Sequence, residues 1–414
     1  MNVLRPLATG VATLTVALAS SLGVAAPSQA AGTIRIGAIY PLSGSQASGG
    51  REEYHGMQVA ARMVNQLGGV QGKRITFVTE DAPSADAAPG AIDGLKRQGV
   101  QVVVGSYGST ISLPASAESQ RDHLIFWESG AVATMITQRG YPNVFRTVTT
   151  GNSLGRAAAR YAATVVAPRV HMAPAQLRAS VVYANDVYAS SVGSAMTAET
   201  RSLGFHLAGV FTYDPYHTDF PRLVSRLKSE RADIVLVAGY VQDAIAFRRE
   251  TLRQHLHPAA MIGTSSAFCM HAFGDTLGRD ASFSTAALQP AARQLRTAVS
   301  AAYRRQYGVD MTAAAVAGFV AGWILFHDVL PQTHSLDPAA VRAAALRVDL
   351  PYGSQINGAG VRFAQPGAPD QGQNLRAISV IWQWQRPGHE VVVYPPSYAT
   401  AQPRWVPLPG WQHQ

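Results

Sequence analysis

The feature that most constrains the fold is a regular alternation of short apolar runs with longer amphipathic stretches. It starts at TIRIGAIY (33–40), which has the period-two pattern of a strand, and continues at 51–69, where apolar residues recur at helical spacing. Further apolar runs follow at ITFVTEDA (75–82), QVVVG (101–105), LIFWE (124–128) and NVFRT (143–147). Strands that alternate with helices of about ten to fifteen residues indicate a parallel sheet with right-handed crossovers.

The same alternation restarts at LRASVVYA (177–184) and runs to AAMIGT (259–264). From about residue 285 the pattern turns helical, and the chain closes with strand-like runs, of which ISVIWQWQ and EVVVY give a hairpin signal. We therefore expect an α/β protein with two doubly wound lobes, between which the chain crosses more than once. The expected division is lobe 1 at 31–150 plus 285–352, lobe 2 at 151–284 plus 353–398, and a C-terminal tail at 399–414.

Residues 1–30 have the parts of a secretory signal: a positive charge at Arg5, an apolar stretch, and Ser28 and Ala30 at a small-residue cleavage site. The competing interpretation is an uncleaved membrane anchor. Several threonines and serines interrupt the apolar stretch and no charged flank follows it, so cleavage is favoured. Residue 31 is alanine and not cysteine, so no lipid anchor is expected. The sequence thus predicts a soluble mature chain exported to the periplasm.

Composition narrows the classes of function. The net charge is +9, but the arginines are spread singly along the chain, which argues against a nucleic-acid partner. The single cysteine, Cys269, cannot form an internal disulfide. The longest apolar run, 313–326, is shorter than the roughly 20 residues that a membrane span needs, so a buried core helix is expected there.

Metal and catalytic signatures are weak. His255-Leu-His257 and Cys269-Met-His271 have a zinc-like spacing, but no Cys-x-x-Cys pair supports them. No local signature marks a catalytic nucleophile and its base. We therefore expect no metal, no cofactor and no catalytic residue.

The stretch VVVGSYGST (102–110) is a strand end that runs into a turn and a helix. It lacks the lysine of a Walker phosphate loop, the third glycine of a dinucleotide fingerprint and the spacing of a nucleophile elbow. Ser109, Thr110 and Ser112 precede Pro114, which fits the first turn of a helix. This predicts a site for a carboxylate or other anion at the helix N-terminus. The alternative is that Ser109 or Ser112 only caps its own helix.

Aromatic residues at strand ends are candidate walls of a cleft between the lobes. Tyr188 and Tyr240 follow strand-to-turn junctions, and Tyr107 lies in the turn described above. Core packing is the alternative role for each of them. In open α/β sheets, ligands bind at the carboxyl ends of the strands, so these tyrosines are expected near the ligand.

Several segments resemble the periplasmic leucine/isoleucine/valine-binding proteins. YPLSG (40–44), VVVGSYGSTISLPAS (102–116), ITQRGYPNVFRT (136–147) and the later TDFPRLVSRLKSERADIVLVAGY (218–240) occur in that family's order, and the resemblance covers nearly the whole mature chain. It implies a type I periplasmic binding fold: two lobes, three crossovers and a cleft that closes on a small solute. It also implies delivery of that solute to the permease of an ABC importer.

At some of the family's ligand-binding positions this sequence has the expected residue, and at others it does not. The serine that binds the ligand carboxylate matches Ser109, whereas valine at Val132 lacks the threonine hydroxyl that the family often has. The acidic partner of the ligand ammonium falls at about Ser265, and an aromatic wall falls at about Gly49, which would leave a roomier pocket. Glu128 is a candidate replacement for the missing acid; its alternative role is a strand-end carboxylate paired with a structural arginine. The candidate ligand-binding residues are Tyr107, Gly108, Ser109, Thr110, Glu128, Gly130, Ala131, Val132, Tyr188, Tyr240 and Ser265.

The sequence as a whole predicts a monomeric, non-enzymatic substrate-binding protein of an ABC importer. The expected solute is a branched-chain amino acid or a related small carboxylate-bearing, aromatic or amide compound. The alternative is a ligand-sensing module, of the amide-sensor type, that reports to a membrane partner. An enzyme ranks third.

Overall fold

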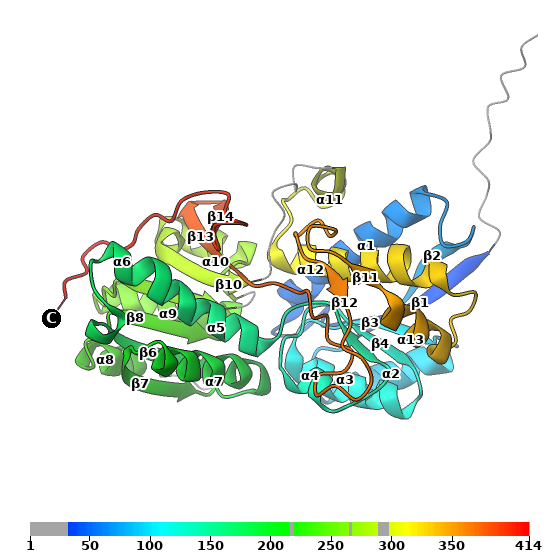
Figure 1. The fold of residues 1–414 in the computed structure, drawn as a ribbon, viewed down its shortest axis with the longest axis horizontal. Coiled ribbons are helices and arrows are strands. Elements are labelled where there is room, and N and C mark those ends of the chain that lie inside the picture. The colour runs from blue at the N-terminus through cyan, green and yellow to red at the C-terminus, as the bar shows by residue number, and fades with distance from the viewer. Residues whose placement is uncertain (1–31, 216–218, 265–266, 289–297, 414) are drawn as a thin grey trace, which may run out of the picture.

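The computed structural model describes residues 32–413 except 216–218, 265–266 and 289–297, and these residues form two α/β lobes (Figure 1). The secretory signal that the sequence predicts at residues 1–30 lies outside the described residues. The two doubly wound lobes are confirmed by the sheets, which are five- and seven-stranded.

Lobe 1 contains a parallel sheet in the order β2-β1-β3-β4-β5. Every residue of β3 and β4 is buried, as expected for strands covered on both faces by helices. The strands are β1 (Thr33–Tyr40), β2 (Arg74–Asp81), β3 (Val102–Gly105), β4 (Ile125–Glu128) and β5 (Val144–Arg146). The early helices of this lobe are α1 (Ala47–Gln66), α2 (Ala87–Arg97), α3 (Ser109–Arg121) and α4 (Met135–Gln138).

Lobe 2 contains a mixed sheet in the order β14-β13-β10-β9-β8-β6-β7. Its central strands are parallel, and β13 and β14 form the predicted antiparallel hairpin at one edge. The strands are β6 (Arg178–Ala184), β7 (His206–Tyr213), β8 (Ile234–Ala238), β9 (Ala260–Thr264), β10 (Ser284–Leu288), β13 (Val380–Arg386) and β14 (His389–Tyr394). The helices are α5 (Gly151–Tyr161), α6 (Ala167–Arg169), α7 (Val187–Ser202), α8 (Phe220–Ser229), α9 (Val241–Arg253) and α10 (His271–Leu277).

The chain passes between the lobes three times, but two passages differ from the predicted boundaries. The prediction placed the return to lobe 1 at residue 285, whereas β10 belongs to the lobe 2 sheet. It also placed 353–398 wholly in lobe 2, whereas Val361 and Phe363 are buried in the lobe 1 core. Apolar alternation identifies a strand but not the sheet it joins, which explains both differences. The late lobe 1 elements are α11 (Ala298–Tyr307), α12 (Ala313–Trp323), α13 (Pro338–Arg347), β11 (Asp349–Leu350) and β12 (Val361–Arg362).

The long apolar helix at 313–332 is buried in lobe 1. By length and composition it is the one helix among the described residues that could span a membrane, but 83% of its most apolar window is buried inside the protein. It lies directly against α1 because glycines stand at the crossing. A Cβ on Gly56 would come within 1.8 Å of the Ala315 carbonyl oxygen, and one on Gly318 within 1.9 Å of the Glu53 carbonyl oxygen. This burial agrees with the predicted core helix.

The predicted C-terminal tail lies along lobe 2, where side chains of the lobe bind it. Arg169 donates to the Pro403 carbonyl oxygen at 2.9 Å, and the Trp411 indole donates to Asp233 at 3.0 Å. These contacts tie the tail to the lobe at two separate points.

Glu390 on β14 makes the stability of lobe 2 dependent on pH. Burial raises the pKa of its carboxyl group to about 8, and a hydrogen bond with the Cys269 thiol opposes this rise. The folded chain therefore holds a proton that the unfolded chain releases near pH 4.3. This contribution to stability is complete below pH 4 and is lost as the pH rises toward 8, by up to about 1.4 kcal/mol per pH unit.

We expect Glu390→Gln to remove that part of the pH dependence, because glutamine does not titrate. The measurement is urea unfolding of both proteins between pH 4.5 and 8, since other buried acids contribute equally to both. Identical slopes for the two proteins would contradict the assignment.

Candidate ligand-binding site

The two sheets direct the carboxyl ends of their strands toward a common cleft between the lobes. The residues that line it follow β1, β3 and β4 on lobe 1 and β6, β7 and β8 on lobe 2. Two cavities there share Tyr240: an inner niche of about 20 Å³ and an outer chamber of about 400 Å³. The inner niche is lined by Tyr107, Gly108, Ser109, Gly130, Val132, Tyr188, Gly239 and Tyr240.

The inner niche lies at the N-terminus of α3. Gly108 is the N-cap residue of the helix, and it has no side chain that could cap the first turn. Ser109 is 1% exposed; its hydroxyl oxygen accepts a hydrogen bond from the Ala133 N–H at 3.0 Å, which leaves the hydroxyl proton to donate. Ser112 instead bonds to Ser106 and Glu128, so neither serine caps the helix. The niche therefore offers uncapped N–H groups, one hydroxyl and the positive end of a helix dipole to an anion such as a carboxylate.

Glu128 lies behind the niche and is not among the residues that line it. Its Oε1 accepts the N–H groups of Gly130 and Ala131 at 2.8 and 2.7 Å, and its Oε2 accepts the Ser106 N–H at 3.3 Å and the Ser112 hydroxyl. Burial raises the pKa of this carboxyl group, and these hydrogen bonds oppose the rise. The geometry favours the structural alternative, with backbone N–H groups as the direct partners.

A second buried carboxyl group explains why residue 130 is glycine. A Cβ there would come within 1.7 Å of Glu53 Oε2. Glu53 Oε1 accepts the Ser129 hydroxyl at 2.6 Å, and Tyr40 shares a hydrogen bond with the same hydroxyl at 2.9 Å. Burial and the neighbouring Glu128 carboxylate raise the pKa of Glu53 well above its usual range. The turn that carries Gly130 thus packs directly on the Glu53 carboxyl group.

Arg146 fixes the same turn from the end of β5. The guanidinium is fully buried and donates to the carbonyl oxygen of Ala133 at 2.6 Å, to Thr137 Oγ1 at 3.0 Å and to Gln373 Oε1 at 2.6 Å. Gln373 belongs to the late segment of lobe 1, so this one side chain links the niche to the last crossing of the chain. Burial lowers the pKa of Arg146 to about 10, while the nearby Glu128 carboxylate raises it.

The predicted roomier wall at Gly49 is occupied by the ring of Tyr107. A Cβ on Gly49 would lie 2.1 Å from Cζ of Tyr107. An aromatic ring therefore covers this position, but it comes from the turn after β3 and not from α1. The expectation of extra room at this wall is wrong because two positions compensate, and the sequence shows them only as separate departures.

Tyr188 and Tyr240 line the niche from lobe 2. Their ring centroids are 5.3 Å apart in an edge-to-face arrangement, and the Tyr188 hydroxyl donates to the Thr264 carbonyl oxygen at 3.1 Å. The structure thus brings these two tyrosines to the face opposite Ser109.

The remaining candidates are distributed around the niche. Thr110 lines the outer chamber, where its Oγ1 accepts a hydrogen bond from the Gln46 amide at 3.2 Å. Val132 lines the niche with an apolar side chain, and Ala131 is buried behind it. Ser265 lies outside the described residues, so its predicted place in the pocket stays a prediction.

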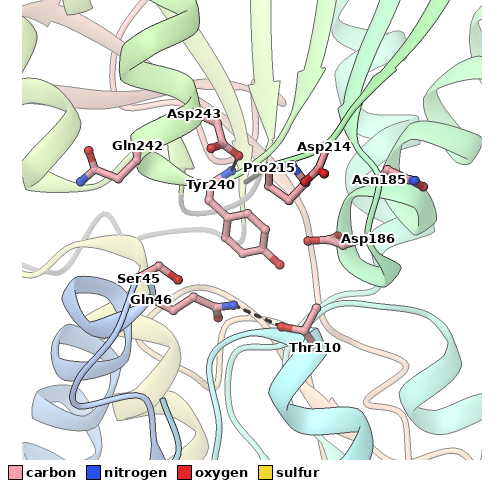
Figure 2. A pocket seen from close by; sticks show the side chains of 10 residues that line it. All are labelled: Ser45, Gln46, Thr110, Asn185, Asp186, Asp214, Pro215, Tyr240, Gln242 and Asp243. Atoms are coloured by element: carbon pink, nitrogen blue, oxygen red, sulfur yellow. Dashed lines mark hydrogen bonds between the residues drawn. The ribbon is translucent and has the colours of Figure 1, made fainter. Parts of the chain in front are cut away.

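The outer chamber contains side chains that were not predicted from the sequence (Figure 2). Asn185 and Asp186 follow β6, Asp214 follows β7, and Asp243 lies three residues after Tyr240. The signal was available, since these polar residues come directly after neighbouring parallel strands, where ligand sites form. The chamber is lined by Ser45, Gln46, Thr110, Asn185, Asp186, Asp214, Pro215, Tyr240, Gln242 and Asp243.

Comparison with known proteins shows which protein family this chain is similar to. A family model described as "Periplasmic binding protein" matches residues 33–377. A relative named Leu/Ile/Val-binding protein homolog 8, from Brucella abortus, is 28% identical over 401 residues, which cover 94% of this chain and 98% of that protein.

Two solved structures share the fold. One is a branched-chain amino acid transporter substrate-binding protein from Streptococcus pneumoniae in complex with isoleucine, with a TM-score of 0.70, 18% identity, and 88% and 100% of the two chains covered. The other is a solute-binding protein of an ABC transporter from R. palustris in complex with benzoate, with a TM-score of 0.73, 17% identity, and coverage of 87% and 95%. At these identities the likeness concerns the fold.

Proposed function

Because this chain belongs to the periplasmic binding protein family, we propose that it serves an ABC importer and binds a small carboxylate-bearing solute between its lobes. It is an extracytoplasmic solute-binding protein with the type I fold and not an enzyme. The proposal includes release of the mature chain as a monomer after cleavage of the signal, and docking on a membrane permease.

The observation that carries the proposal is the uncapped N-terminus of α3 in the inner niche. Ser109 lines it with a hydroxyl proton to donate, and the N-cap residue Gly108 supplies no side-chain hydrogen bond to the first turn of the helix. Isoleucine and benzoate, found in the two structural neighbours, share a carboxylate but not an ammonium. A carboxylate is therefore the common group that this niche suits.

The test is thermal unfolding of refolded, ligand-free protein with leucine, 4-methylpentanoate, benzoate and a neutral amide. A carboxylate at a hundred times its Kd should add about 2.7 kcal/mol and raise the Tm by a few degrees. Ser109→Ala should weaken binding by about ten- to a hundredfold, because a hydrogen bond to a charged group is lost.

The matched control is Ser153→Ala, in the first turn of α5 and exposed. It should leave binding unchanged. The proposal fails if no carboxylate raises the Tm, or if Ser109→Ala binds as well as the unchanged chain.

We expect Gly49→Ala to weaken binding of the same carboxylates by about tenfold, because the added methyl group pushes the Tyr107 ring toward the niche. Stability should change little, since alanine favours the helix. The control is Gly90→Ala in α2, where a Cβ meets nothing within 4 Å. Isothermal titration of both variants checks this, and equal affinities would show that the ring does not border the ligand.

A further inference from the structure

We propose that the solute carries, besides its carboxylate, an amine or guanidinium group that lies in the outer chamber against Asp186, Asp214 and Asp243 (Figure 2). This inference rests on the proposed function, because the carboxylate in the inner niche orients the solute. It specifies a solute longer than leucine, with a cationic group remote from its carboxylate, in place of a simple branched-chain amino acid.

The negative charge of the chamber wall indicates that the solute group lying there is positively charged. Three of its ten described lining residues are aspartates and none is a lysine, arginine or histidine. The chain as a whole has a net charge of +9, so this wall departs from the average surface. Burial raises the pKa of both Asp186 and Asp243, although hydrogen bonds to each carboxylate oppose the rise. A buried carboxylate is stabilised by an opposite charge close by.

Two unpartnered polar atoms in the same chamber point independently to a ligand. The Tyr240 hydroxyl and the Gln46 Oε1 are both buried, and neither forms a hydrogen bond of good geometry within the described residues, although Asp186 and Thr110 lie close enough to shift the pKa of the Tyr240 hydroxyl. Figure 2 shows the Tyr240 hydroxyl directed into the chamber, between Asp186 and Thr110. Buried polar groups are ordinarily satisfied, so a donor and an acceptor left open on opposite walls suit a polar solute that spans them.

The volumes of the two cavities indicate which part of the solute lies in each. A niche of about 20 Å³ suits only a small polar head, whereas the chamber of about 400 Å³ has the size of an ordinary ligand site. The carboxylate therefore belongs in the niche beside Ser109, and the body with its cationic group extends into the chamber.

The aspartates also have local structural roles, which the test must preserve. Asp186 caps α7 by accepting the Ala189 N–H at 2.8 Å, and Asp243 accepts the Tyr240 N–H and the Tyr213 hydroxyl, both at 3.1 Å. Asparagine keeps an acceptor and caps a helix as well as aspartate does, so Asp→Asn removes the charge and keeps the cap.

The experiment is titration calorimetry of the full mature chain with hexanoate, 6-aminohexanoate, leucine and arginine. The pair hexanoate and 6-aminohexanoate differs only in the distal amine. We expect 6-aminohexanoate to bind at least about tenfold more tightly than hexanoate, and arginine more tightly than leucine. Asp186→Asn and Asp243→Asn should each reduce both preferences several-fold.

The matched control is Asp337→Asn, which makes the same change at the cap of α13 on lobe 1, away from the chamber. If hexanoate binds as tightly as 6-aminohexanoate and leucine binds as tightly as arginine, this inference is overturned while the proposed function stands. If no carboxylate binds, both are overturned.

Discussion

Replacing Arg146 by methionine is expected to lower the free energy of unfolding by about 3–5 kcal/mol, because it leaves a buried polar network without its central donor. The guanidinium donates to Gln373, Thr137 and the Ala133 carbonyl oxygen from a fully buried position. Methionine fills a similar volume, so the loss reports the unpaired acceptors and not a large cavity. The Glu128 carboxylate would also lose its interaction with this buried positive charge.

Urea unfolding measures this change, with Arg35→Met, on the exposed side of β1, as the control. The control should alter the unfolding free energy by no more than about 0.5 kcal/mol. Arg146→Lys should lie between the two, since one ammonium cannot reach all three acceptors. An Arg146→Met protein as stable as the control would contradict the role assigned to this side chain.

Sequence periodicity predicted most of the fold because the parallel strands are short, apolar and separated by amphipathic helices. It missed β10 at Ser284–Leu288, four small residues and a leucine beside a stretch with a helical pattern. It also misplaced the segment around Phe363, whose ring packs on Trp127 with centroids 5.3 Å apart. Which sheet a strand joins depends on side-chain packing over long sequence distances, and periodicity carries none of that information.

The site was predictable where local chemistry decides it. Ser109 could be found because a strand end, a glycine and an uncapped helix follow each other within a few residues. The pairing of Gly49 with Tyr107 and the wall formed by Asp186, Asp214 and Asp243 arise only when separate elements meet in space. The resemblance supplied the position of Gly49, but neither the Tyr107 ring that covers it nor the three aspartates.

Glu128 is the residue whose role the sequence left open, and replacing it should have the second large effect. Glu128→Ala is expected to lower the free energy of unfolding by about 3–5 kcal/mol, because buried donors are left without an acceptor and Arg146 without its counter-charge. The donors are the N–H groups of Ser106, Gly130 and Ala131 and the Ser112 hydroxyl. Since two of these belong to the turn that lines the niche, binding of every carboxylate should weaken together.

Glu128→Gln separates this structural role from a contact with a ligand ammonium. Glutamine keeps one oxygen for the Gly130 and Ala131 N–H groups, so this variant should lose about 1–3 kcal/mol of stability. Leucine and 4-methylpentanoate differ only in the amine, and we expect the ratio of their affinities to match that of the unchanged chain. A structural carboxylate acts on the turn, which both compounds contact through their carboxylates. If the ratio instead collapses in Glu128→Gln while 4-methylpentanoate binds normally, Glu128 pairs with the ammonium, and the cationic group of the solute lies in the niche and not against the aspartate wall.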